Sequence, residues 1–252
     1  MDFVYPSNED IKSLVALWSE SFGDSDEYIS MFFERAFSPQ RCRIAVGGGE
    51  LLGALYWFDS TYLGEPIAYL YAISTAERHR GRGVCRALMA DTHRLLSERG
   101  YVASILTPAK PSLYSFYSKI GYTPFGSMRE YKAERGQGSI PIVKISKEEY
   151  ASLRRDLLPE FSVIQEGVCL EYLSAEADFY KADGALMAAR KTASRLFAHE
   201  LLGSVSPEDI LNSFGCDSGV FRSPGVGAPC GMFLPLLDFS HPLPKYFGFP
   251  FD

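Results

Sequence analysis

Apolar residues recur in the first half of the chain at two spacings, one helical and one extended. Ile11, Leu14 and Trp18 repeat at helical intervals after Ser7, which has an acidic residue three positions later, as a capping box requires. Short apolar runs beside glycines are typical of strands, and residues 47–49, all glycine, predict a hairpin between two such runs. The pattern predicts helices over residues 11–20, 26–36, 83–99 and 112–120, and strands over residues 43–46, 51–58, 67–74, 101–107 and 126–132.

The composition changes at residues 133–138, a polar run with two glycines that predicts a linker. Beyond it, the pattern predicts strands over residues 140–145, 184–190 and 195–202, and helices over residues 147–158 and 207–214. We therefore expect two domains, residues 1–135 and residues 139–252. Similar short stretches at 27–34 and 169–176 suggest a degenerate duplication, and an unrelated α+β second domain fits the sequence about equally well.

The bulk composition excludes several classes of protein. Of the 252 residues, 46% are hydrophobic and 22% are charged, which is typical of globular chains. A net charge of −6 argues against a general nucleic-acid binder. No apolar run approaches the ~20 residues of a membrane span, and the first residues lack the pattern of a signal peptide. Five scattered cysteines without a Cys-x-x-Cys pair favour reduced thiols over disulfides or a zinc site. We expect a cytoplasmic protein with no metal, membrane or nucleic-acid partner.

The most specific chemistry lies between the predicted strand 67–74 and the predicted helix 83–99. The connecting sequence is Arg78-His79-Arg80-Gly81-Arg82-Gly83-Val84. Free N–H groups at a helix start bind anions, glycines let the backbone approach a phosphate closely, and arginines add charge-assisted hydrogen bonds. This segment therefore predicts a diphosphate site, although two glycines alone more often mark an ordinary turn into a helix.

Two common phosphate-binding loops do not fit this segment. A Walker A loop ends in Lys-Ser/Thr, whereas Val84 and Cys85 follow the last glycine here. A dinucleotide fingerprint needs a third glycine, where this chain has Ala87, and an acidic residue about 20 positions later that is not clearly present.

The full pattern resembles that of the GNAT superfamily of N-acetyltransferases. Arg78-x-x-Gly81-x-Gly83 is similar to the superfamily's Q/R-x-x-G-x-G/A pyrophosphate motif. The strand before it ends in Ala72-Ile73-Ser74, and residues 115–122 resemble the "FYxKxGF/Y" segment. The resemblance covers about residues 1–132. It implies an α/β GNAT fold, with a mixed central sheet flanked by helices and a smaller GNAT-like or α+β second domain.

The resemblance also implies roles for individual residues. Acetyl-CoA is the expected co-substrate. The backbone of Ala72, Ile73 and Ser74 is expected to hold its pantetheine arm, and residues 78–84 its pyrophosphate. Tyr117 matches the general acid that protonates the departing thiolate, and a phenol with a pKa of ~10 suits that role. The alternative for Tyr117 is an ordinary aromatic core residue.

The expected reaction is transfer of an acetyl group to a primary amine of a small molecule. A protein amine as acceptor, or an acyl-CoA-binding module without turnover, are the alternatives. The general base stays open, because Ile67 stands where the histone-acetylating branch has a glutamate. Asp59 and Glu65 are near in sequence, but solvated loop charges explain them better, and Tyr69 or Tyr71 could relay the proton through water.

Three other features have simpler interpretations. His93 is expected on the exposed side of its helix, and Cys85 is interpreted as a small apolar residue because no partner suggests a nucleophile. The aromatic stretch 246–252 is too apolar for open solvent, so it is expected to pack on the protein or to border the acceptor cleft.

Overall fold

The structure is a computed structural model that describes residues 1–251. It forms two compact units. Unit 1 comprises Met1–Thr123 and Met232–His241, and unit 2 comprises Pro124–Gly231 and the residues from Pro242 on. The domain division expected between residues 135 and 139 therefore falls inside unit 2. Asp252, the last residue of the expected second domain, lies outside the described residues.

The first sheet is mixed and has seven strands in the order β1-β2-β3-β4-β5-β13-β6. Its strands are β1 (Asp2–Val4), β2 (Cys42–Gly47), β3 (Glu50–Tyr62), β4 (Glu65–Thr75), β5 (Ala103–Leu106), β6 (Thr123–Phe125) and β13 (Gly231–Pro235). Strands β1 to β4 pair antiparallel in sequence, β4 pairs parallel with β5, and β13 pairs antiparallel with β5. The hairpin and the strands predicted over residues 43–74 are confirmed.

The helices of unit 1 are α1 (Ile11–Phe22), α2 (Asp26–Arg35), α3 (Val84–Glu98) and α4 (Pro111–Ser118), with short 3-10 turns η1 (Asn8–Asp10), η2 (Pro39–Arg41) and η3 (Glu77–His79). All four predicted helices are confirmed to within a few residues. The predicted capping box is also present, because the Ser7 hydroxyl accepts from a backbone N–H and Asp10 accepts from Ser7 N.

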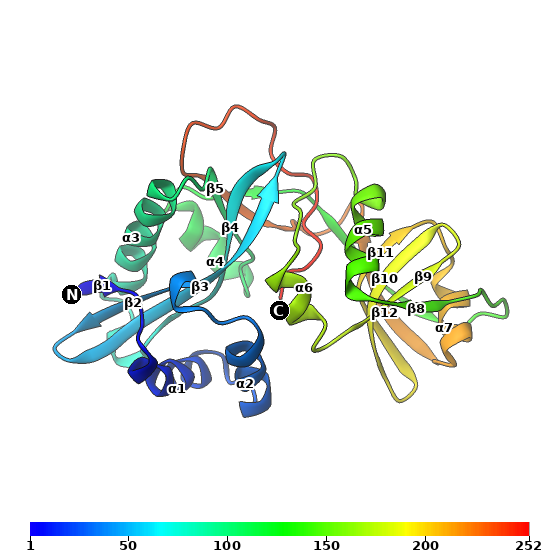
Figure 1. The fold of residues 1–252 in the computed structure, drawn as a ribbon, viewed down its shortest axis with the longest axis horizontal. Helices are drawn as coiled ribbons and strands as arrows, with labels where there is room; N and C mark the ends of the chain where they lie inside the picture. The colour runs from blue at the N-terminus through cyan, green and yellow to red at the C-terminus, as the bar shows by residue number, and fades with distance from the viewer. Residues whose placement is uncertain (252) are drawn as a thin grey trace. The chain divides into compact units, whose positions relative to one another are not determined.

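Successive side chains of β3 point to opposite faces of the first sheet, so the core of unit 1 has two parts, one on each face. Leu55 and Trp57 face α3 and α4, in a buried cluster that includes Leu88. The next residue on the opposite face, Tyr56, packs its ring against Trp18 of α1 at 5.4 Å. Helices α1 and α2 therefore cover one face of the sheet and α3 covers the other (Figure 1).

Unit 2 contains a second mixed sheet in the order β7-β12-β11-β10-β9-β8. Its elements are β7 (Met128–Glu134), β8 (Val143–Ile145), α5 (Lys147–Leu157), α6 (Val168–Leu173), β9 (Asp178–Ala182), β10 (Ala185–Thr192), β11 (Arg195–Gly203), α7 (Pro207–Phe214) and β12 (Ser218–Pro224). Two mixed sheets with flanking helices confirm the expected fold class.

Strand β7 corrects one part of the expected organisation. The sequence predicts residues 126–132 as the last strand of the first domain and residues 133–138 as a linker. Instead β7 pairs antiparallel with β12 from Met128 to Glu134, at the edge of the second sheet. The partner strand lies about ninety residues later in the chain, so no local pattern could reveal the pairing.

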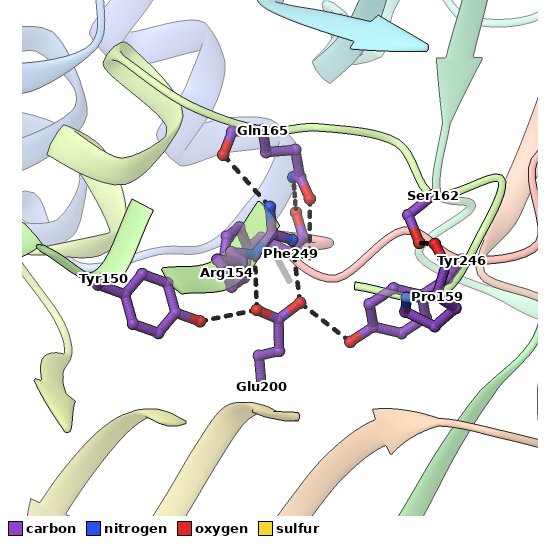
Figure 2. A network of polar contacts seen from close by, with 8 residues as sticks. All are labelled: Tyr150, Arg154, Pro159, Ser162, Gln165, Glu200, Tyr246 and Phe249. Carbon is purple, nitrogen blue, oxygen red and sulfur yellow. Dashed lines mark hydrogen bonds and ion pairs between the residues drawn. The ribbon is translucent and has the colours of Figure 1, made fainter. Parts of the chain in front are cut away.

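A buried ion pair joins a helix and a strand of unit 2. Arg154 of α5 contacts both carboxylate oxygens of Glu200 of β11, with Nε–Oε2 at 2.7 Å and Nη2–Oε1 at 2.9 Å. The hydroxyls of Tyr150 and Tyr246 also donate to Glu200, so four hydrogen bonds converge on this carboxylate (Figure 2). These interactions satisfy a charge that would otherwise be costly to bury.

The aromatic segment after Pro244 packs on unit 2 through this network. Gln165 exchanges two hydrogen bonds with the backbone of Phe249, and the Arg154 guanidinium lies 4.3 Å from the centre of the Phe249 ring (Figure 2). Tyr246 and Phe247 are buried. The expectation that this segment packs on the protein is confirmed for its described residues.

Among residues 1–251, no helix is long and apolar enough to cross a membrane. All five cysteines are free thiols.

Candidate functional site

Strands β4 and β5 separate in the middle of the first sheet. Their parallel pairing runs only from Ile67–Ala103 to Leu70–Leu106. Two residues later, Ala72 has a left-handed φ of 46°, and β4 contains an extra residue relative to β3 at this point, which forms a β-bulge. Within the described residues, no strand pairs with residues 72–75 on the side of β5. The backbone of Ala72, Ile73 and Ser74 therefore borders an opening between the two strands.

The segment 78–84, here called the glycine turn, connects this open end of β4 to α3. Gly81 and Gly83 have φ values of 74° and 79°, which other residues adopt only at a cost. Serine side chains cap α2, α5 and α7, whereas no side chain caps α3. The first N–H groups of α3, from Val84 on, are therefore available to an anion at the positive end of the helix.

A pocket of about 350 Å³ lies against the glycine turn. It is lined by Thr75, His79, Arg80, Gly81, Gly83, Val84, Cys85, Arg86 and Phe116. Arg80 donates from Nε to the carbonyl of Thr75 at 3.1 Å. Arg82 and Arg86 are exposed and make no ion pair within residues 1–251. The pocket therefore combines uncapped N–H groups with uncompensated positive charge, which suits a diphosphate.

Arg78 forms an ion pair with the β2–β3 hairpin and does not line the pocket at the glycine turn. Its guanidinium pairs with Glu50 at 2.9 Å, and His79 Nε2 lies 3.5 Å from the same carboxylate. Arg78 also lines a separate groove of about 650 Å³, together with Glu20 and Glu77. The first arginine of the motif thus braces the glycine turn against the β2–β3 hairpin.

Tyr117 lies on α4, next to Phe116 of the pocket lining. Its side chain is 7% exposed, and burial raises the pKa of its hydroxyl well above the usual value for tyrosine. The hydroxyl therefore stays protonated at neutral pH. It makes no hydrogen bond within residues 1–251. Tyr117 belongs to the buried cluster of unit 1 and is not among the residues that line the pocket.

The acidic candidates for a general base lie at the other end of β4. Ile67 is completely buried. Asp59 stands opposite Ala68 in the strand register, accepts a hydrogen bond from the Tyr101 hydroxyl and pairs with Arg41 at 3.5 Å. Glu65 begins the strand. At ~3.3 Å per residue, four residues or more separate these positions from Ala72 by over 10 Å.

The two tyrosines that could relay a proton differ in their surroundings. Tyr69 is 1% exposed, whereas Tyr71 is 9% exposed and directly precedes the bulge at Ala72. The Tyr71 hydroxyl lies 2.8 Å from that of Tyr28 on α2. Of the candidates from the sequence, Tyr71 is the titratable group next to the opening of the sheet.

The expectation for His93 is wrong. His93 Nε2 lies 2.8 Å from the Tyr122 hydroxyl, and burial lowers the pKa of this histidine to about 4. The signal was present in the sequence, since His93 follows Met89 by four positions and precedes Leu96 by three, and both are buried. Because histidine is polar, we expected His93 on the exposed side of the helix despite this spacing.

Four residues line the pocket but were not among the predicted binding residues: Thr75, Cys85, Arg86 and Phe116. Cys85 follows the glycine turn directly, and burial raises the pKa of its thiol to about 11. It is therefore a neutral thiol at pH 7, which agrees with its interpretation as a small apolar residue.

Known proteins with similar sequences are acetyltransferases. Residues 4–125 match the family model described as an acetyltransferase (GNAT) domain. The chain is 28% identical over 140 residues to the N-acetyltransferase Eis of Mycobacterium tuberculosis (strain ATCC 25177 / H37Ra). This alignment covers 52% of the chain and 34% of the relative, so the chain matches about a third of that protein's length.

Solved structures show the same fold over most of the chain. A GCN5-related N-acetyltransferase from Anabaena variabilis has a TM-score of 0.76 at 17% identity, over 93% of this chain and 72% of that one. Eis1 from Mycobacterium abscessus has a TM-score of 0.65 at 15% identity, over 89% and 66% of the two chains. These likenesses extend through both units and establish the fold.

Proposed function

We propose that this chain, whose residues 4–125 match the GNAT acetyltransferase domain, transfers an acetyl group from acetyl-CoA directly to a primary amine. One observation carries the proposal. Strand β4 leaves β5 at the left-handed Ala72, beside an uncapped helix start that follows two glycines. This arrangement supplies backbone groups for an extended chain and a site for a diphosphate in adjacent positions, as acetyl-CoA requires.

The binding contacts follow from these positions. On the side of β5, where no described strand pairs with it, the backbone of Ala72, Ile73 and Ser74 would pair with the amide groups of the pantetheine arm. The N–H groups around Gly81, Gly83 and Val84 would hold the pyrophosphate, while His79, Arg80 and Arg82 add polar contacts and charge. Arg86, outside the motif, lines the same pocket and strengthens its positive potential.

The reaction is a nucleophilic substitution at the thioester carbonyl. The amine nitrogen attacks the carbonyl carbon, the C–N bond forms, and the C–S bond breaks with its electron pair on sulfur. Tyr117 donates its proton to that sulfur, the amine nitrogen loses one proton as the amide forms, and solvent returns a proton to Tyr117. Holding both reactants together supplies most of the acceleration, and N–H groups of β4 stabilise the oxygen that becomes negative.

The proposed acceptor is a small primary amine. Because Asp59 and Glu65 lie at the far end of β4, the amine proton would leave through water beside the Tyr71–Tyr28 pair. An amine must lose its proton before attack, so the rate should rise with pH until the bound amine is neutral.

Turnover with a panel of amines tests this function. Wild-type protein, acetyl-CoA and each amine are incubated with a thiol-detecting dye, and the acetylated product is identified by mass. We expect amine-dependent release of CoA with one acetyl group gained by the amine. If calorimetry shows that acetyl-CoA binds but neither small amines nor lysine peptides accelerate CoA release, transfer is refuted and a binding function remains.

A further inference from the structure

We propose that His93, Ser104 and Tyr122 form a largely buried positioning network that holds Tyr117 in place for proton donation. The inference rests on the proposed function, in which Tyr117 is the general acid. None of the three side chains lines the glycine-turn pocket, so their effect would pass through Tyr117.

The network joins three separate elements at one hydroxyl. The Tyr122 hydroxyl lies 2.6 Å from Ser104 Oγ of β5 and 2.8 Å from His93 Nε2 of α3. Tyr122 itself follows the turn at the end of α4. Tyr122 is 1% exposed, Ser104 is fully buried and His93 is half-buried, so water does not readily replace the bond between Tyr122 and Ser104.

The Tyr122 hydroxyl, at the centre of this network, can be satisfied without a net charge. Burial keeps the pKa of His93 low, so the ring is neutral at pH 7 and carries one N–H. Either His93 donates to Tyr122 and Tyr122 donates to Ser104, or Ser104 donates to Tyr122 and Tyr122 donates to His93. In both arrangements the hydroxyl has one donor and one acceptor as neighbours. A buried set satisfied in this way is rigid, because breaking it leaves an unpaired polar group.

Tyr122 is connected to Tyr117 through both backbone and side chain. The carbonyl of Tyr117 accepts hydrogen bonds from Ile120 N at 2.9 Å and Tyr122 N at 3.1 Å. The two tyrosine rings pack edge to face, with centroids 5.9 Å apart. Gly121, with a φ of 108°, makes this close turn possible. Fixing the Tyr122 ring therefore fixes the peptide and one side of the ring of Tyr117.

This support matters because the Tyr117 hydroxyl makes no hydrogen bond within residues 1–251. Packing alone orients its hydroxyl, and a displacement of ~1 Å can reduce a rate ~10²-fold. A network that anchors the neighbouring turn to both α3 and β5 would limit that displacement. CoA binding, in contrast, depends on the glycine turn and should be insensitive to it.

The experiment compares four variants with the wild type. Tyr122→Phe and His93→Leu remove the network's hydrogen bonds, and His93→Gln keeps an amide able to reach the hydroxyl. Thr92→Val is the matched control, because the buried Thr92 hydroxyl donates to the Leu88 carbonyl of the same helix and does not contact Tyr122. For each variant, kcat, KM, the dissociation constant of acetyl-CoA and the melting temperature are measured.

We expect Tyr122→Phe and His93→Leu to lower kcat by ~10–10²-fold with less than about a twofold change in acetyl-CoA affinity. His93→Gln should recover most of the lost kcat. Thr92→Val should lower the melting temperature and leave kcat unchanged. In a Tyr117→Phe background, Tyr122→Phe should cause little further loss, because the group that it positions is already absent.

Two results separate failure of this inference from failure of the proposed function. If the wild type transfers acetyl groups but His93→Leu and Tyr122→Phe keep its kcat, the network is only structural and the inference is wrong. The same conclusion follows if His93→Gln does not recover activity. If Tyr117→Phe retains the wild-type rate, the general-acid role itself fails. Should Tyr122→Phe not fold, Ser104→Ala removes the other partner of the same hydroxyl and takes its place.

Discussion

Tyr117 has the two properties that a proton donor to a thiolate needs. A tyrosine hydroxyl keeps its proton at neutral pH even at its usual pKa of ~10, and burial raises the pKa of Tyr117 further. No described residue competes for that proton. Developing negative charge on sulfur would then draw the proton as the C–S bond breaks. The hydroxyl therefore contributes to the transition state more than to binding.

Tyr117→Phe tests this role, because it removes the hydroxyl and keeps the ring. We expect kcat to fall by ~10²–10⁴-fold, with little change in acetyl-CoA affinity. Tyr101→Phe is the control, since it removes a hydroxyl that donates to Asp59 near the start of β5, and it should leave kcat unchanged. Steady-state kinetics, with chemistry shown to limit the rate, makes the comparison. Equal rates for Tyr117→Phe and wild type would make Tyr117 a core aromatic.

His93 should make stability dependent on pH. In the unfolded chain it takes up a proton near pH 6.5, but in the folded protein only near pH 4. Between these values the unfolded state binds more protons, so the unfolding free energy should fall as the pH is lowered from 6.5 to 4. The full loss is up to about 3 kcal/mol. Urea unfolding at several pH values measures it, and His93→Gln should show a smaller loss. Parallel curves for the two proteins would contradict the assignment.

At the scale of elements, the glycine turn and the start of α3 together form the expected phosphate-binding site. The predicted helix and its glycine start are both present, and the missing cap is what leaves the first N–H groups available. Substitution of Gly83 would disturb this phosphate-binding site in two ways. A β-branched residue is strained at a φ of 79°, and its side chain would enter the space where a phosphate is expected.

Gly83→Val should therefore reduce acetyl-CoA affinity at least ~10²-fold while the protein stays folded. Gly100→Val is a matched control, because Gly100 ends the same helix with a φ of 82° and equally open surroundings. Both variants should lose similar stability, and only Gly83→Val should lose binding. Calorimetric titration with acetyl-CoA measures the affinities. Wild-type affinity in Gly83→Val would show that the glycine turn is not the phosphate site.

Local signals predicted the elements that depend on local interactions. Helix α7 runs from Pro207 to Phe214 as expected, because Ser206 caps it and Gly215 ends it. Strands β7 and β13 could not be placed, since each pairs with a strand about ninety or more residues away. In the candidate site, too, local features were predictable and long-range contacts were not. The glycine turn was visible as a motif, whereas the pairing of Arg78 with Glu50 and of His93 with Tyr122 depends on tertiary contacts.

At the scale of the molecule, unit 2 depends on a charge pair deep in its interior. Glu200→Gln would leave Arg154 charged and buried with no counterion, which typically costs ~3–5 kcal/mol. The control Glu166→Gln breaks the ion pair with the largely exposed Arg155 and should cost less than about 1 kcal/mol. Urea unfolding compares the two variants. Equal, small losses would mean that the buried pair contributes no more than a surface pair.

The described residues of unit 2, up to residue 251, show no arginine-rich glycine turn that would make a second site for CoA. Its closest counterpart to the glycine turn is Gly167, with a φ of 54° before α6, a helix of six residues. The pocket there, of about 490 Å³, is lined by Glu148, Glu166 and Glu171 and by one cation, Lys147, which pairs with Glu171. A phosphate would therefore meet three carboxylates and no arginine. The duplication suggested by residues 27–34 and 169–176, if it occurred, did not preserve an anion site in unit 2.

Titration should therefore give one acetyl-CoA per chain. The positive potential of Arg80, Arg82 and Arg86 lies at the glycine turn, and the carboxylates around Gly167 oppose binding of a second diphosphate. Calorimetry measures the stoichiometry, with active protein concentration fixed independently. Gly83→Val is the diagnostic variant, because it should abolish all of the binding and not half of it. Two sites in the wild type, or one site surviving in Gly83→Val, would place a functional CoA site in unit 2 and overturn the assignment of binding to unit 1 alone.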